Sequence, residues 1–230
     1  MPVRLVVLLV PLILLSICRS GWGVGGLHTV SEDAYLRAAR NEGEYKAGPR
    51  YPDFRSVCVV GRFRDSDDWQ GSGVLVAPGW VLTAAHCVLR KKKAPRLERD
   101  LKVRFGSRID DRSREYRVEA IHLTLPLDPQ VLRPLLSERK VSRAATRHAD
   151  RNDIALLKLD RHVEGIPVAA LFEGRAEPGS RICFAGFGSY ATGRQKKEKH
   201  WKEDGWKRAA ENTLDRDGHH PAGGLIAFDF

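Results

Sequence analysis

The chain has 230 residues, a length that suits one domain or two small ones. Hydrophobic residues make up 42% of it and charged residues 30%, which excludes a disordered chain, a collagen and a multi-span membrane protein. The 39 basic residues outnumber the 29 acidic ones, giving a formal net charge of +10. We therefore expect attraction to anionic partners. The four cysteines are too few for a scaffold built on disulfides.

The first twenty residues have the pattern of a secretory signal peptide. One positive charge lies within Met1–Arg4, and the stretch Leu5–Cys18 that follows is uncharged and contains Pro11. A membrane-spanning helix needs about 20 apolar residues, so this shorter stretch fits the apolar region of a signal peptide better. An uncleaved N-terminal anchor is the alternative. In either case we expect the protein to be secreted or periplasmic, and we expect no stable membrane span.

Beyond this leader, the pattern predicts one short helix and then strands. The helix is expected over Val30–Arg40, with Ser31 as its N-cap. From Val57 onward, short apolar or alternating runs are separated by turns such as Pro78-Gly79. Many short strands with little helix indicate an all-β barrel or sandwich. The expected strands are Val57–Val60, Gly73–Ala77, Trp80–Thr83, Leu101–Phe105, Tyr116–Leu123, Ile154–Leu159, Ile182–Ala185 and Leu225–Phe230.

Three charged stretches interrupt the strand pattern. Arg90–Arg99 and Leu125–Arg147 are strongly basic, and Gly193–Arg208 mixes charges of both signs. Such runs usually form solvated loops, and we expect Gly193–Arg208 to be exposed. The alternative for the two basic stretches is a site for an acidic polymer. Neither holds interleaved aromatic residues, which argues against specific nucleic-acid binding.

Two segments carry candidate catalytic residues. The hairpin pattern of Gly71–Cys87 (GSGVLVAPGWVLTAAHC) delivers His86 just past the end of a strand. In Arg151–Leu159 (RNDIALLKL), Asp153 stands before an apolar strand. A carboxylate in that position is well placed to fix the tautomer of an imidazole and to stabilise its protonated form. Each signal is ambiguous alone, and together they point to acid–base chemistry.

These two segments resemble the histidine and aspartate segments of the trypsin-like (chymotrypsin-fold, S1) serine proteases. A third match is Cys183–Gly188 (CFAGFG), which resembles the turn that opens that family's second barrel. The resemblance covers about Val57 to Phe230. It implies a double antiparallel β-barrel fold with the active site between the barrels, His86 as general base, Asp153 as its orienting carboxylate, and a protein or peptide as substrate.

The resemblance also implies a nucleophilic serine in a G-D-S-G-G motif, which is absent from the 230 residues. After Asp153 the serines are Ser180 and Ser189, and both are interpreted as turn residues. The chain also ends at Phe230 within an apolar run. We therefore expect a truncated chain, with the first barrel complete and the second incomplete, that does not hydrolyse peptides by the family mechanism as it stands.

The cysteines and the activation route also depart from the family pattern. Relatives bridge the cysteine of the TAAHC motif to one before the G-S-G segment, a position assigned here to Gln70, so the usual disulfide of Cys87 is absent. Cys58 is an alternative partner for Cys87, and the pairing of Cys183 stays open. No I-V-G-G activation segment precedes Val57, and Val24–Gly26 (VGG) is a weak echo of one.

Two functions remain. The first is a secreted serine endopeptidase, with a signal peptide over 1–20, a pre-barrel segment over 21–56 and a C-terminally truncated peptidase domain over 57–230. The alternative is a catalytically inactive homologue that binds anions through its basic stretches. The resemblance implies no cofactor. His200, His219 and His220 lack further ligands at metal-binding spacing, so no metal site is expected.

Overall fold

The structure is a computed structural model, and it describes residues 23–27, 29–63, 67–90, 96–124, 126, 152–173, 178–192 and 202–214. The expected signal peptide, the basic stretch Leu125–Arg147 and the expected strand Leu225–Phe230 lie outside these ranges, apart from residue 126. Among the described residues, no helix is long and apolar enough to cross a membrane.

Six antiparallel strands close into a barrel, which confirms the expected first barrel. Their order around it is β2-β3-β4-β9-β8-β7. Alternating apolar residues point inward, and Val60, Leu75, Val81, Val103 and Leu157 are fully buried there. The strands are β2 (Val57–Phe63), β3 (Asp67–Ala77), β4 (Trp80–Thr83), β7 (Lys102–Phe105), β8 (Glu115–Leu123) and β9 (Ala155–Leu159).

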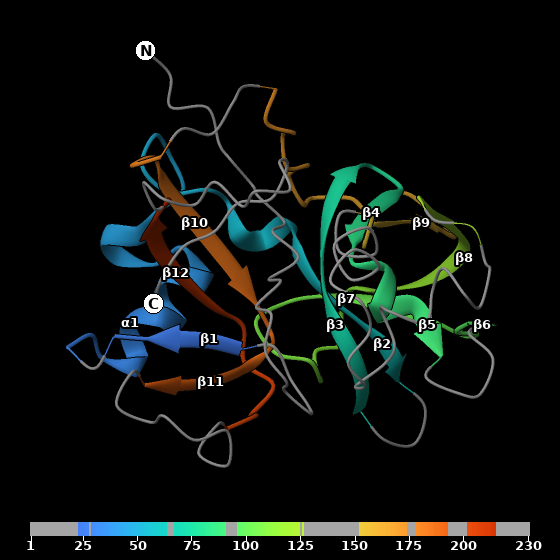
Figure 1. Cartoon of the computed structure of the whole chain (residues 1–230), viewed down its shortest axis with the longest axis horizontal. Helices are drawn as coiled ribbons and strands as arrows, with labels where there is room; N and C mark the ends of the chain where they lie inside the picture. The colour runs from blue at the N-terminus through green and yellow to red at the C-terminus, as the bar shows by residue number, and fades with distance from the viewer. Residues whose placement is uncertain are drawn as a thin grey trace, which may run out of the picture.

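The described residues after 177, called the second half below, form no closed barrel. β10 (Arg181–Gly186) pairs antiparallel with β12 (Arg208–Thr213). β11 (Ser189–Thr192) pairs in parallel with β1 (Gly23–Gly26) from the start of the chain. Figure 1 shows these four strands and the helix on one side of the molecule and the barrel on the other. At the basic stretch Arg90–Arg99, β5 (Leu89–Arg90) pairs antiparallel with β6 (Arg96–Leu97).

The residues ahead of the barrel pack against the second half. The helix α1 (Glu32–Arg40) begins at Ser31, whose side chain accepts a hydrogen bond from the Ala34 amide, as expected from the sequence. It ends at Asn41, which has a left-handed backbone and whose side chain bonds to Pro52 and Phe54. The described residues also include three single-turn helices, η1 (Gly43–Tyr45), η2 (Phe54–Ser56) and η3 (Ala85–Val88).

A second apolar cluster, called the interface core below, joins these parts. Val59 and Val74 on the barrel strands alternate with residues that fill the barrel interior, so they face outward into this cluster. Ala39 of α1 and Phe187 of the second half meet them there. The pre-barrel residues 31–56, called the N-terminal segment below, therefore share one core with the barrel surface and the second half.

The expectation that Gly193–Arg208 is exposed holds at the described residues 202–204 and is wrong at Lys207 and Arg208. The Lys207 and Arg208 side chains are buried. Lys207 Nζ donates to the carbonyls of Phe54 and Val57 at 2.8 and 3.3 Å. Arg208 pairs with Glu32 and Asp204 at 2.6 and 2.7 Å. Buried charges are tolerated where they are paired or hydrogen-bonded, and these partners could not be read from local sequence.

Candidate active site

His86 is placed by the β3–β4 hairpin. β4 ends at Thr83, and the chain turns at once into η3, which carries His86. The small residue Ala85 beside it is fully buried, so the turn packs tightly against the end of the barrel. The run of small residues ahead of His86 thus lets a histidine stand at the rim of the barrel.

Asp153 reaches the same place from a different strand. It lies two residues before β9, which pairs antiparallel with β4 so that Ala155 is opposite Thr83. His86 therefore follows the end of one strand and Asp153 precedes the start of its neighbour. The barrel brings together two residues that are 67 positions apart in the sequence.

Both oxygens of the Asp153 carboxylate are used on His86. Oδ2 lies 2.6 Å from His86 Nδ1, and Oδ1 accepts a hydrogen bond from the His86 backbone amide at 2.8 Å. The Asp153 side chain is 7% exposed and that of His86 is 24% exposed. With Nδ1 held as the donor, the other ring nitrogen, Nε2, is left as the basic atom.

The surroundings of His86 act on its pKa in opposite directions. Burial lowers the pKa of His86, whereas Cys87 and the Asp153 carboxylate raise it, and the net effect is upward. The hydrogen bond and the charge of Asp153 are among the causes that oppose burial. Asp153 therefore favours the protonated imidazole that proton abstraction produces.

Cys87 next to His86 carries a free thiol, and Cys58 and Cys183 are free as well. The residue that faces Cys87 is Gly71, and not Gln70 as the sequence suggested. A Cβ built on Gly71 would lie 2.4 Å from Cys87 Sγ. Adjacent residues of a strand point to opposite faces. An assignment that is wrong by one residue therefore places the partner of Cys87 on the wrong face of the strand. The alternative pairing of Cys58 with Cys87 is not formed.

The two serines that follow Asp153 lie in the second half. Ser180 follows the turn before β10, and its carbonyl accepts from the Leu214 amide. Ser189 opens β11, is buried, and its hydroxyl donates to Glu203 Oε1 at 2.6 Å. The hydroxyl of Ser189 thus has a structural partner within the second half.

Sequence reasoning missed two polar residues that support the site. Thr83, at the end of β4, donates from Oγ1 to the Ser72 carbonyl at 2.8 Å. Ser72 Oγ in turn accepts from the Phe187 amide at 3.0 Å. Both lie in Gly71–Cys87, the segment that carries His86, but hydroxyl residues within strands give no local signal of their partners.

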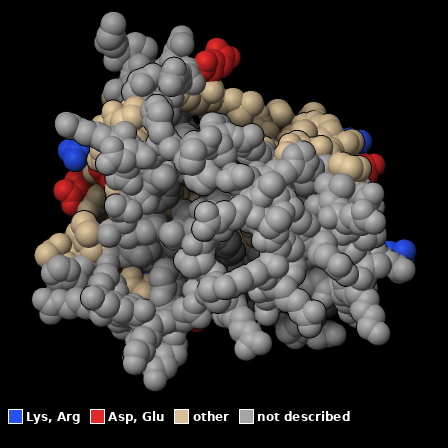
Figure 2. All heavy atoms as spheres, viewed as in Figure 1, with Lys and Arg blue, Asp and Glu red and all other residues tan. Residues whose placement is uncertain are grey.

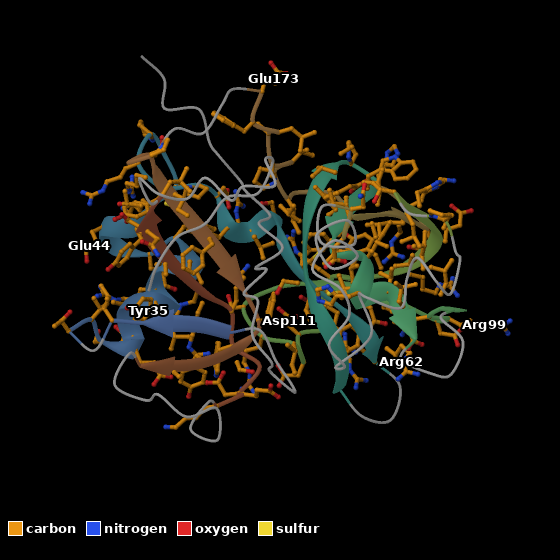
Figure 3. All side chains as sticks on the ribbon, viewed as in Figure 1. Tyr35, Glu44, Arg62, Arg99, Asp111 and Glu173 are labelled. Carbon is orange, nitrogen blue, oxygen red and sulfur yellow. The ribbon has the colours of Figure 1, made fainter. Side chains whose placement is uncertain are left out.

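Charges on the described surface are mixed. On the face drawn in Figure 2, the coloured acidic and basic groups appear at the rim, some of them close together. Figure 3 places Arg62 and Arg99 on the barrel side, and Tyr35 and Glu44 on the side of α1.

Within the part of the chain that the structure describes, no group of three or more metal-ligating side chains comes together. His200, His219 and His220 fall outside that part.

A closed six-stranded antiparallel barrel with a histidine and an aspartate hydrogen-bonded at its rim defines a class of protein, the trypsin-like β-barrel proteins. The Trypsin family model matches residues 53–205. The chain therefore belongs to the trypsin family.

The chain is also similar to solved structures. Mouse neuropsin, a serine protease expressed in the limbic system of the brain, is 16% identical, with 76% of this chain and 70% of that chain covered and a TM-score of 0.51. A mutant of human heparin binding protein (CAP37) is 18% identical, with 70% of this chain covered and a TM-score of 0.44. The chain spans 60% of the length of that protein.

Proposed function

We propose that this chain is the histidine- and aspartate-bearing part of a secreted serine endopeptidase. The observation that carries the proposal is that the Asp153 carboxylate makes two contacts with His86. Its Oδ2 lies 2.6 Å from His86 Nδ1, and its Oδ1 accepts from the His86 backbone amide at 2.8 Å. A carboxylate in both contacts fixes the position of the ring and also its tautomer. This is the arrangement that general-base catalysis by a histidine needs.

In the proposed reaction, His86 Nε2 takes the proton of a serine hydroxyl as that oxygen attacks a peptide carbonyl. His86 then returns the proton to the leaving amine, and water repeats the cycle on the acyl intermediate. The Asp153 carboxylate stabilises the imidazolium. The nucleophile and its oxyanion hole require a G-D-S-G-G segment, which the 230 residues do not contain, so they would come from sequence outside this chain.

The proposal is tested on protein expressed from the natural gene, including any codons that follow residue 230. A fluorophosphonate probe reports an activated serine, and a fluorogenic peptide library reports hydrolysis. We expect His86→Ala to lower kcat/KM by about 10³-fold or more. His122 is an exposed histidine on β8, so His122→Ala is the matched control and should leave both signals unchanged. Absence of labelling and hydrolysis in the natural protein would refute the proposal.

The pH profile tests the role of Asp153 separately. A protonated His86 cannot act as a base, so kcat/KM should rise with pH through the pKa of His86. Because the surroundings raise that pKa, the midpoint should lie above the ordinary histidine value of about 6.5. Asp153→Asn should lower the midpoint and also lower kcat. An unchanged midpoint of the pH profile in Asp153→Asn would contradict the role of Asp153 in raising the pKa of His86.

The inactive, anion-binding homologue remains a prediction of the sequence. Most of its basic stretches, Leu125–Arg147 and the middle of Arg90–Arg99, lie outside the described residues. The specific contacts of His86 and Asp153 favour the enzyme, because an anion-binding surface has no chemical need for them. A G-D-S-G-G motif downstream would support the enzyme, and another residue at the serine position would support the homologue.

A further inference from the structure

Ser72 lies where the barrel meets the second half, and its carbonyl and its hydroxyl bond to different parts of the molecule. It belongs to β3, between Gly71, which lies against Cys87, and Gly73, which lies against Val81 of the barrel core. Because successive side chains of a strand point to opposite faces, the Ser72 side chain points away from the barrel interior.

The carbonyl of Ser72 is tied to the strands that carry the site. It accepts the hydrogen bond from Thr83 Oγ1 at 2.8 Å, and Thr83 is 3% exposed. Thr83 is paired with Gly73 on β3 and with Ala155 on β9. It therefore lies at the strand ends from which His86 and Asp153 project, so Ser72 is fixed relative to both.

The hydroxyl of Ser72 is tied to the second half. It accepts from the backbone amide of Phe187, a residue that is 1% exposed and belongs to the interface core. Gly186 permits the close approach, because a Cβ at that position would lie 2.9 Å from Ser72 Oγ. The contact is thus polar and buried, and it requires the absence of a side chain at residue 186.

We propose that Ser72 is a positioning residue for the proposed hydrolysis, holding the second half at a fixed distance from His86. This inference rests on the proposed function, in which His86 must meet a nucleophile that the barrel itself does not carry. A looser contact at Ser72 would widen the range of distances between His86 and the nucleophile, while leaving the His86–Asp153 pair intact. Because placement of reacting groups enters the rate steeply, kcat should suffer more than KM.

The contact is tested first without any assay of activity, by amide hydrogen exchange on the full chain. Ser72→Ala leaves the Phe187 amide without its acceptor, so we expect its exchange to accelerate about tenfold, as for the loss of one buried hydrogen bond. Exchange of β4 and β9 and the proton resonance of His86 Nδ1–H should not change. Ser56 is another buried serine, whose hydroxyl donates to the Asp53 carbonyl, so Ser56→Ala is the matched control. Unchanged exchange at Phe187, or an equal rise in the control, would overturn the inference.

A second variant separates the contact from the loss of a hydroxyl. Gly186→Ala keeps Ser72 but adds a methyl group against its Oγ, so Phe187 exchange should rise in this variant too. In the Ser72→Ala background, the nearest atom to the added methyl group is the Cβ of residue 72, at 3.5 Å, which is an ordinary contact. The effects should therefore be less than additive. Strict additivity would show that the two positions are not coupled, against the proposal.

The reaction is tested last, in the protein used for the probe labelling above. Ser72→Ala should lower kcat about tenfold and change KM by less than about twofold, while Ser56→Ala changes neither. Full kcat in an active Ser72→Ala enzyme would overturn the positioning role. If the natural protein is inactive, the proposed function fails and the positioning role fails with it, whereas the exchange experiment still shows whether the contact itself exists.

Discussion

The barrel interior and the interface core bury different kinds of side chain. Inside the barrel, the fully buried residues are apolar, such as Leu75, Val81 and Leu157. Around the interface core, Arg104, Lys207 and Arg208 are 3% exposed or less. Arg104 stacks on Phe63 of the interface core at 3.7 Å and pairs with Glu115. Charge is thus buried on the outer side of the barrel and in the second half.

The difference follows from how each region meets its backbone hydrogen bonds. A closed barrel has no free edge, so apolar packing is enough to stabilise it. The second half consists of two-stranded pairs, which are marginal by themselves. Its described residues gain stability from directed charged contacts to the N-terminal segment, through Arg208 to Glu32 and through Lys207 to the Phe54 carbonyl. The comparison predicts that the two regions respond differently to substitution.

The largest expected effect is in the barrel. Leu157→Ala removes a fully buried side chain from β9, between β4 and β8, and leaves a cavity. We expect it to lower the free energy of unfolding by about 3 kcal/mol, measured by urea denaturation. A decrease in the free energy of unfolding of less than about 1 kcal/mol would contradict the view that apolar packing inside the barrel stabilises it.

A change of similar size is expected from the titration of Lys207. Burial lowers its pKa from 10.5 to about 8. Between these values the unfolded chain binds more protons than the folded one, so the free energy of unfolding should rise with pH, by about 3 kcal/mol in all. Lys207→Met should remove this rise. The difference between the pH profiles of unfolding free energy of the wild type and of Lys207→Met gives the contribution of Lys207 alone. Identical profiles would contradict the lowered pKa of Lys207.

The next effect concerns Arg208. Its guanidinium bonds to Glu32 and Asp204 and stacks on Tyr190 at 3.5 Å. Arg208→Met leaves both carboxylates without this partner, and we expect a loss of about 2 kcal/mol because each is partly exposed and can be rehydrated. Limited proteolysis should show the N-terminal segment becoming sensitive before the barrel. Simultaneous cleavage of both would count against two distinct regions.

The smallest effect is expected for a surface pair on the barrel. Lys158 Nζ lies 2.9 Å from Glu119 Oε2, and both side chains are about half exposed. Lys158→Met should change the free energy of unfolding by less than about 0.5 kcal/mol in the same urea titration. This variant also serves as the control for Arg208→Met, since both remove one paired cation. Equal losses would show that burial does not distinguish the two pairs.

Much of the barrel and the contact between His86 and Asp153 could be predicted from sequence, because both depend on local patterns. Alternating apolar runs give strands, and a turn such as Pro78-Gly79 joins β3 to β4. His86 and Asp153 stand beside such runs, so neighbouring strand ends bring them together.

The second half could not be predicted in the same way. β1 consists of Gly23–Gly26 with no alternating pattern, and its partner β11 is 166 residues further along. Lys207 and Arg208 lie in a charged stretch that resembles an exposed loop, yet Arg208 reaches a partner 176 residues away. Gly71, and not Gln70, faces Cys87, a difference of one position that only the strand register decides.

The pairing of β1 with β11 has a consequence for how the protein is made. β1 is synthesised before the barrel strands, but its partner β11 follows the whole barrel in the sequence. At about 5–20 residues per second, the 166 residues that separate the paired strands take about 8–33 seconds to synthesise. The barrel can close during that interval, because all its strands lie between them. We therefore expect the early residues of the nascent chain to wait unpaired, where a chaperone or a protease can reach them.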